Sequence, residues 1–280
     1  MRTIAHAAAL LATLCAAVPA ARAADESLDR TLVHQSLSPA ANVVNVALRN
    51  DLGVGLYHKE RTSNTTWLEP SFPTAIFGGG WILAHRVHLP LVWQPVVVAR
   101  TGGTYGLAGL RYEMLLAPVT SGAWSGGLGF GLQFPTESDY TIGDHKWAAG
   151  PSGALSWSRG AVHAGVAATQ LWTYASSGGY PTVDRLTLEP TLSLDLPAGF
   201  YLLSAPSVVA DWKRPAADRW TIPVGGGVGK VFAPGGTRVA LTLQGYWTAR
   251  GPTESWTTQH PYTAPPDWTI RAGIALLFAR

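Results

Sequence analysis

Cysteine is almost absent from this chain, which has only Cys15 among 280 residues. Cys15 lies inside the N-terminal segment MRTIAHAAALLATLCAAVPAARA, which has an early arginine, an apolar run and small residues at Ala21 and Ala23. This layout is typical of a secretory signal peptide over residues 1–23, cleaved after Ala23. The mature chain then has no cysteine, which excludes disulfides and cysteine-ligated metals.

Charge is scarce as well, and neither sign dominates. Only 13% of the residues are charged, against about 25% in an ordinary soluble protein. Without Arg2 and Arg22 of the leader, 18 basic residues face 17 acidic ones. Because a nucleic-acid-binding surface needs clustered Lys and Arg, we expect no nucleic-acid partner.

Long apolar runs and motifs for catalysis or cofactors are also missing. Beyond the leader no run reaches the roughly 18 apolar residues of a membrane helix. The stretch PVGGGVGKVF (223–232) approaches a nucleotide loop, but Val224 replaces its first glycine and Val231 its Ser or Thr. GxSxG is absent, and the histidines lack a metal-ligand spacing such as HxxxH. We therefore expect no catalytic residue, no metal and no cofactor.

Residues that alternate between apolar and polar are abundant. In LTLEPTLSLDL (186–196) leucines and Pro190 occupy the even positions, and Thr, Glu, Ser and Asp occupy the odd ones. A period of two predicts a strand with one apolar and one polar face. In PVGGGVGKVF the glycines Gly225, Gly227 and Gly229 fall on the polar face, where they leave room for long facing side chains such as Arg86 or Arg271. Such alternation predicts twelve strands, near 42–50, 65–76, 80–93, 104–117, 122–134, 145–157, 160–173, 184–196, 199–212, 218–231, 237–249 and 267–279.

The length and faces of these strands favour a membrane barrel over a soluble sandwich. Each has about ten residues, as a membrane-crossing strand needs, whereas ordinary strands average about five or six. The polar face is mainly Gly, Ala, Ser and Thr, which suits a narrow lumen. Aromatic residues near strand ends resemble the girdles of membrane barrels; they are Trp67, Trp81, Trp124, Trp147, Trp172, Trp212, Trp220 and Trp268.

The links between strands alternate in length. Short links such as FGGG, SRG, PAG and APGG alternate with longer ones at 51–64, 94–103, 135–144, 174–183 and 250–266. Short periplasmic turns and long extracellular loops are the pattern of outer-membrane barrels. The sequence thus predicts an all-β fold over 42–280, a closed antiparallel transmembrane β-barrel of about twelve strands in a Gram-negative outer membrane. Both termini are expected on the periplasmic side.

Two features do not fit this pattern directly. Prolines interrupt the predicted strands, and because proline cannot donate to a β-ladder we expect them at rims or bulges; they are Pro70, Pro90, Pro151, Pro190, Pro206 and Pro223. The segment 24–41, ADESLDRTLVHQSLSPAA, has leucines at roughly helical spacing. It is a periplasmic tail, a short helix or a partial plug of the barrel.

Several runs of the sequence resemble one bacterial family. These are LEPSFP, WILAHRVHLPLVWQP, HKWAAGP, FYLLSAPSVVADWKRPAADRWTIPVGGGVGKVF (200–232) and PPDWTIRAGIALLF, in order over most of 65–278. They resemble the outer-membrane family catalogued as the meta-pathway phenol-degradation family, some of whose members are mislabelled "neuromedin U". The resemblance implies a porin-like or hydrocarbon-uptake channel for a small aromatic or hydrophobic solute. The chain departs from the family pattern at Gly109 and at Thr169-Gln170.

Strand parity places a set of polar side chains inside the predicted barrel. They either select a solute or form ion pairs that fill the lumen; they are Arg49, Glu69, Arg86, Arg111, Glu113, Lys146, His163, Arg185, Glu189, Asp195, Asp211, Arg219 and Arg271. His85 and His88 are three apart and therefore point to opposite faces. The expected partners are outer-membrane lipid, a small solute and the barrel-assembly machinery, which reads the C-terminal strand at Phe278.

Two alternatives to a passive channel stay open. An outer-membrane hydrolase would show a clustered Ser–His or Asp–His pair at the rim of the barrel. A structural barrel with no open pore would show a constriction across the whole lumen.

Overall fold

The computed structural model describes residues 31–40, 42–56, 61–95, 103–139, 141–176, 182–233, 237–260 and 264–278. The predicted leader, residues 1–23, lies outside these ranges. No helix within them is both long enough and apolar enough to cross a membrane.

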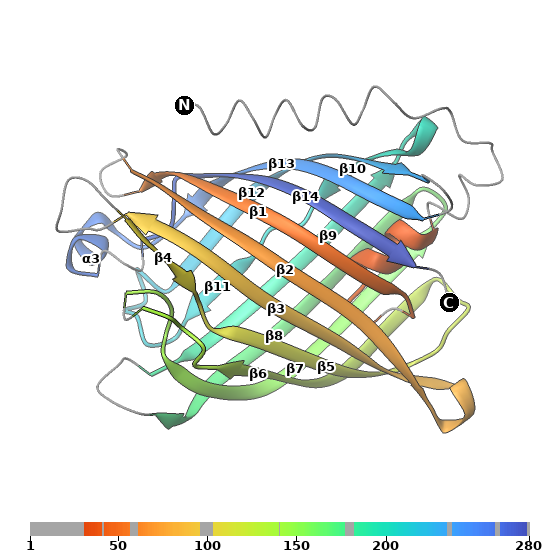
Figure 1. The fold of residues 1–280 in the computed structure, drawn as a ribbon, viewed down its shortest axis with the longest axis horizontal. Helices are drawn as coiled ribbons and strands as arrows, with labels where there is room; N and C mark the ends of the chain where they lie inside the picture. The colour runs from red at the N-terminus through yellow and green to blue at the C-terminus, as the bar shows by residue number, and fades with distance from the viewer. Residues whose placement is uncertain are drawn as a thin grey trace.

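The chain forms one antiparallel sheet that closes on itself as a barrel (Figure 1). Closure is made by β1 and β14, which pair from Val44↔Phe278 to Val54↔Trp268. The strands are β1 (Val44–Leu56), β2 (Arg61–Ile76), β3 (Trp81–Pro95), β4 (Gly103–Leu107), β5 (Leu110–Pro118), β6 (Trp124–Phe134), β7 (Lys146–Arg159), β8 (Val162–Ser176), β9 (Asp184–Asp195), β10 (Phe200–Ser204), β11 (Val208–Asp211), β12 (Trp220–Phe232), β13 (Arg238–Arg250) and β14 (Trp268–Phe278).

These fourteen segments form the twelve strands of the barrel wall. Segments β4 and β5 both pair with β3 and are separated by residues 108–109. Segments β10 and β11 both lie between β9 and β12 and are separated by residues 205–207. Each of these two pairs is one interrupted strand, so the predicted fold class and strand count are confirmed.

Links of two kinds lie at opposite ends of the barrel. The 3-10 turns η1 (Phe77–Gly79) and η2 (Pro197–Gly199) are at the short-link end, together with the start of β1 and the end of β14. The opposite end carries the longer links, one of which contains α3 (Glu254–Gln259), seen at the left of Figure 1. In outer-membrane barrels the short-link end faces the periplasm.

One predicted link was wrong. Residues 51–56 continue β1 and residues 61–64 belong to β2, so the 51–64 link contracts to residues 57–60. The alternation that supports β1 runs on through Leu52, Val54 and Leu56, with Asp51 on the opposite face. Asp51 therefore faces the lumen rather than a loop.

The outer surface is apolar, as strand parity predicts. Leu128 is 78% exposed, Leu192 56% and Val224 55%, and large apolar residues such as these line every side of the barrel. Trp81 and Trp124 lie near the short-link end, whereas Trp147, Trp172, Trp212 and Trp268 lie near the long-link end. Trp67 is an exception to the predicted girdles, because its indole nitrogen is buried within the barrel.

The in-strand prolines are not all at rims or bulges, and that expectation was wrong for several of them. Pro223 does adjoin a register shift in β12. In contrast, Pro70 and Pro151 lie mid-strand, where the ladder on one side omits two consecutive residue pairs without a shift in register. A missing donor is thus accommodated by a short gap in the ladder rather than by an edge.

Three prolines meet in neighbouring strands. Pro206 lies in the interruption between β10 and β11, where the register places it opposite Pro190 of β9 and beside Pro223 of β12. Side chains from the lumen replace the lost ladder bonds there. The Ala205 N–H donates to the Tyr246 hydroxyl (2.9 Å), and Arg271 donates to the Ala205 carbonyl (2.8 Å).

Gly229 allows a close approach inside the barrel, but not by an arginine as the sequence predicted. A Cβ added at Gly229 would lie 2.2 Å from the ring of Tyr201. Tyr201 is buried and packs with Leu203, Val231 and Leu277. The space left by this glycine is filled by Tyr201, while Arg271 turns to Asp51.

Candidate functional site

A network of ion pairs occupies the middle of the lumen. On one wall Arg49 of β1 lies 3.3 Å from Glu69 of β2, and Arg271 of β14 binds Asp51 at 2.7 Å. His88 of β3 joins the network through a 2.9 Å bond to Glu69. Buried charges require such partners, since an unpaired one is strongly destabilising.

Arg86 carries this network across the lumen. It lies 3.1 Å from Glu113 of β5 and 3.5 Å from Glu189 of β9. Four strands separate β3 from β9 around the shorter side of the barrel, so the second contact spans the interior. Thr169 of β8 reaches back to Glu113 at 2.9 Å. A chain of polar side chains therefore joins opposite walls of the lumen.

Trp67 lies next to this network with cations near its ring. The guanidinium carbons of Arg49 and Arg111 lie 4.9 and 5.5 Å from the ring centroid, within the range of cation–π attraction. The Trp67 indole nitrogen and Arg49 Nε are both buried and have no hydrogen-bond partner among the described residues.

Other predicted lining residues lie toward the long-link end. Arg185 holds Asp144 with bonds of 2.8 and 2.9 Å, and Asp211 lies 3.1 Å from Arg214. The Arg219 guanidinium lies 5.2 Å from the Trp212 ring. Lys146 is buried at the start of β7.

Asp144 is held ionised by its neighbours. Burial alone would raise the pKa of its carboxyl. The Arg185 charge and the hydrogen bonds from Arg185 and Gln133 outweigh burial, so the pKa of Asp144 lies below its ordinary 3.8.

A segment of the chain crosses the lumen at the short-link end. Residues 31–37 are helical, and Figure 1 shows this orange-red helix inside the right-hand end of the barrel. Leu32 and Val33 pack against Tyr201, Leu203 and neighbouring wall residues. Ala40 packs against Ile82 and other residues of β3 and β5.

Polar contacts also hold this segment. His34 Nε2 lies 3.1 Å from Asp195 of β9. The Ser38 hydroxyl lies 3.3 Å from Ser125 and 3.0 Å from Ser156, on β6 and β7. Residues 31–40 thus touch both sides of the periplasmic end of the lumen.

Two histidine contacts lie close together at this rim. The Ser158 hydroxyl lies 2.8 Å from His163 Nδ1, and the rings of His163 and His34 are 5.4 Å apart. Asp195 contacts His34, and the second ring nitrogen of His163 has no hydrogen-bond partner among the described residues. No group of three or more His, Cys, Asp or Glu that could hold a metal is found within the described ranges.

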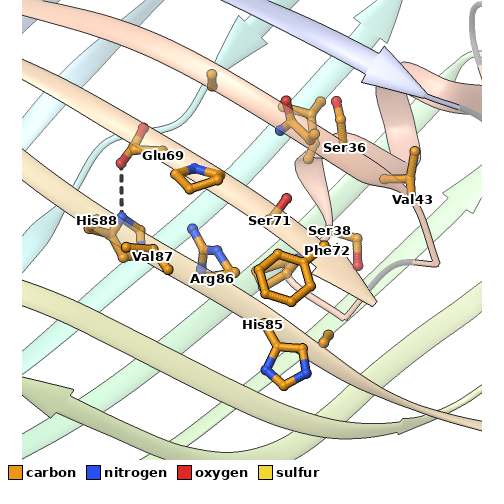
Figure 2. A pocket seen from close by; sticks show the side chains of 16 residues that line it. Ser36, Ser38, Val43, Glu69, Ser71, Phe72, His85, Arg86, Val87 and His88 are labelled. Carbon is orange, nitrogen blue, oxygen red and sulfur yellow. Dashed lines mark hydrogen bonds and ion pairs between the residues drawn. The ribbon is translucent and has the colours of Figure 1, made fainter. Parts of the chain in front are cut away.

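Three cavities surround the N-terminal segment. A cavity of about 140 Å³ lies between Ser36, Ser38, Glu69 and Arg86. Figure 2 shows it, with the bond between Glu69 and His88 drawn as a dashed line. A second, of about 200 Å³, lies between Leu37 and the arginines of the charge network. A third, of about 360 Å³, opens beside His34 and Ser158 at the short-link rim.

His85 and His88 point to opposite faces, as predicted. His88 is 4% exposed and faces the lumen. His85 lies on the outer face, where it bonds to the Tyr112 hydroxyl at 2.6 Å and stacks on Phe72.

Sequence reasoning missed several side chains that lie inside the barrel. Asp51 was assigned to a loop, although the alternation already reaches it. Gln244 and Tyr246 lie on the predicted inner face and are 6% and 2% exposed, but they are uncharged and gave no signal. His34 lies in the N-terminal segment, which has no strand parity to place it.

Comparisons with known proteins agree with this fold. No family model matches the chain, and no curated protein matches it. The crystal structure of the COG4313 outer membrane channel from Pseudomonas putida F1 is similar, with a TM-score of 0.61 and 14% identity over 85% of this chain and 96% of that one.

Two further structures show weaker likeness. The NanC porin has a TM-score of 0.49 and 10% identity, over 85% of this chain and 100% of that one. An outer membrane phospholipase A from Escherichia coli has a TM-score of 0.45 and 11% identity, over 90% of this chain and 98% of that one.

Together the closed sheet, the apolar exterior and the polar interior define the class of this protein. It is a β-barrel of the bacterial outer membrane, surrounded by lipid. The similarity to the Pseudomonas putida channel is one of fold.

Proposed function

We propose that this barrel is a passive channel for a small solute, with the predicted lining residues in its path. The observation that carries the proposal is the composition of the barriers inside it. A band of charged side chains and a ten-residue segment narrow the lumen without filling it, because cavities of about 140, 200 and 360 Å³ lie next to them. Because buried ion pairs add little to stability compared with apolar packing, a purely structural barrel has no need of this interior.

The family resemblance in the sequence supports a small aromatic or hydrophobic solute. A liposome-swelling assay with graded solutes tests passage. We expect liposomes to swell with small solutes and the swelling rate to fall sharply as solute size grows, because the charge network narrows the lumen. Rates equal to those of protein-free liposomes for every solute would favour the closed structural barrel.

We also propose that residues 31–40 form a displaceable plug at the periplasmic end. The support is their position across the lumen and the small number of polar contacts that hold them. Ser38→Cys with Ser156→Cys would place two thiols where hydroxyls now lie 3.0 Å apart. The mature chain is expected to have no other cysteine.

In this double variant we expect slow swelling after oxidation and restored swelling after reduction. Ser156→Cys alone is the control and should not respond to oxidant. Equal rates in the oxidised and reduced double variant would mean that solutes pass without movement of the segment.

A hydrolase remains the second candidate, because the Ser158–His163 contact lies at the rim. The carboxylate that would complete a triad, Asp195, contacts His34 instead. Turnover of short-chain esters or phospholipids that Ser158→Ala abolishes would establish this activity. Turnover that survives the substitution would argue against a role for Ser158.

We further propose that the assembly machinery recognises the last strand through Phe278. The side chain is 41% exposed on the outer face at the short-link end of β14. Phe278→Ser should lower the folded yield in the outer membrane, while refolding of purified protein into detergent should change little.

A further inference from the structure

The cavity of about 200 Å³ in the middle of the lumen is lined by both apolar and charged side chains. Leu37 and Pro39 of the N-terminal segment contribute apolar side chains, as do Leu203 and Ala240 of the wall. The lining also includes three guanidinium groups, from Arg49, Arg86 and Arg271, and two carboxylates, from Glu69 and Glu189.

Each of these charges has at least one partner of opposite charge. Arg271 binds both oxygens of Asp51, at 2.7 and 3.3 Å. Glu69 has one oxygen on His88 at 2.9 Å and the other on Arg49 at 3.3 Å. Asp51 and Glu113, which neutralise Arg271 and Arg86, do not line the cavity.

Arg49 has no contact as short as the 2.7 Å bond of Arg271 to Asp51 or the 3.1 Å bond of Arg86 to Glu113. Its contacts to Glu69 and Asp51 are 3.3 and 3.5 Å long, beyond the usual range of a charge-assisted hydrogen bond. The contact to Asp51 is made by the buried Nε and the contact to Glu69 by Nη1, so only the terminal nitrogens of the guanidinium can meet a ligand. A planar anion placed in the cavity would give this guanidinium the paired short bonds that it lacks.

The volume limits the rest of the ligand. An apolar cavity of about 150 Å³ is large enough to hold benzene. A cavity of about 200 Å³ therefore accepts one ring or a branched chain of similar size together with a carboxylate. The apolar body of the ligand would pack against the apolar side chains near Leu203, and its carboxylate would bind Arg49.

We propose that this cavity is a binding site for a small monocarboxylate with an apolar body, with Arg49 as the residue that determines specificity. The proposal rests on the channel function above and gives it a substrate class. It differs from passage of neutral hydrocarbons, because the head group needs a negative charge.

The test is a fluorine NMR titration of 4-fluorobenzoate with the purified full-length barrel in detergent micelles, with empty micelles subtracted. We expect a saturable shift that benzoate reverses. Acetate, which lacks the body, and benzyl alcohol, which lacks the charge, should compete at least tenfold less well. Equal competition by acetate or by benzyl alcohol would overturn the proposal.

Arg49→Gln should weaken 4-fluorobenzoate binding about tenfold or more, the loss expected for one charge-assisted pair. Arg159→Gln is the matched control, because it removes the same charge from the exposed end of β7 and should leave affinity unchanged. Heat-modifiable migration on gels verifies folding of each variant. If Arg49→Gln does not fold, Arg49→Lys keeps the charge but loses the planar pair of terminal nitrogens and should bind more weakly than the native protein.

Unchanged affinity in the folded Arg49 variant would overturn the site. Swelling rates with small neutral sugars separate this outcome from a failure of the channel. If sugars pass and benzoate does not bind, the channel stands and the site is wrong. If benzoate binds and no solute passes, the site stands and the channel function is wrong.

Discussion

At the scale of single residues, position along a strand decides whether a side chain meets lipid or a polar lumen. Leu192 is 56% exposed on the outer face, and its neighbour Thr191 lines the cavity in the middle of the lumen. The two residues are adjacent in sequence, but their side chains lie on opposite faces of the barrel wall.

Leu192→Arg should therefore destabilise the barrel far more than Thr191→Arg. A charge against lipid near the middle of a strand costs about 2–4 kcal/mol, whereas an arginine at position 191 enters a cavity that already contains ion pairs. Unfolding in urea, followed by tryptophan fluorescence, measures both variants. Equal losses would contradict the assignment of faces.

The ion pair of Asp144 with Arg185 should give a small pH-dependent contribution. The pKa of Asp144 lies below 3.8, so the native state favours the charged form and the contribution is present above pH 3.8. It is lost as the pH falls through the lowered pKa. Its size should be at most about 1 kcal/mol, because the two side chains are 26% and 29% exposed.

Comparison with Asp144→Asn isolates this contribution. The difference in unfolding free energy between the native protein and the variant should be constant from pH 7 to pH 5 and should shrink below the ordinary pKa of 3.8. A difference that grows on acidification would mean that Asp144 is protonated in the folded barrel.

At the scale of elements, the wall and the N-terminal segment are built differently. Most strands are held by two neighbours through long ladders, such as the eleven-residue registers of β1 with β14 and with β2. Residues 31–40 have no ladder and rest on apolar packing and a few side-chain bonds. The segment therefore has little to contribute to closure of the sheet.

Deletion of residues 24–40 should leave a folded barrel that passes solutes faster. The strands pair without the segment, although Tyr201 and Leu203 lose their apolar cover, which should lower stability by a few kcal/mol. Circular dichroism and liposome swelling on the same preparation measure the two effects. A truncated chain that folds normally but swells liposomes at the native rate would show that the segment is no barrier.

At the scale of the whole molecule, closure pairs the first and last strands of the sheet with each other. The continuous pairing of β14 with β1 leaves no unpaired ladder toward lipid, where an open edge would be very costly. The apolar exterior then meets the hydrocarbon, and the charges gather in the interior.

The intact protein should fractionate with the outer membrane and migrate differently on gels before and after boiling, since a closed barrel resists detergent. Its mature N-terminus, read by mass spectrometry, should be Ala24 if the leader is cleaved as expected. Recovery as a soluble periplasmic protein would contradict the architecture.

The sequence alone determined the strands, their number and the face of most side chains. These follow from a period of two, which is local and can be counted along the chain, as in the leucines of 186–196. The predictions for glycines and prolines were less accurate, because the effect of these residues depends on which residue lies opposite them. Tyr201, for example, lies opposite Gly229.

Only the tertiary structure decided which inward side chains meet. Arg86 and Glu189 are 103 residues apart, and they touch because closure of the sheet brings distant strands face to face across the lumen. The contact of Trp67 with Arg49 and the contact of His34 with Asp195 likewise depend on the width of the barrel and the register of its strands. Alternation determines whether a side chain points inward, but only closure of the barrel determines which side chains it contacts there.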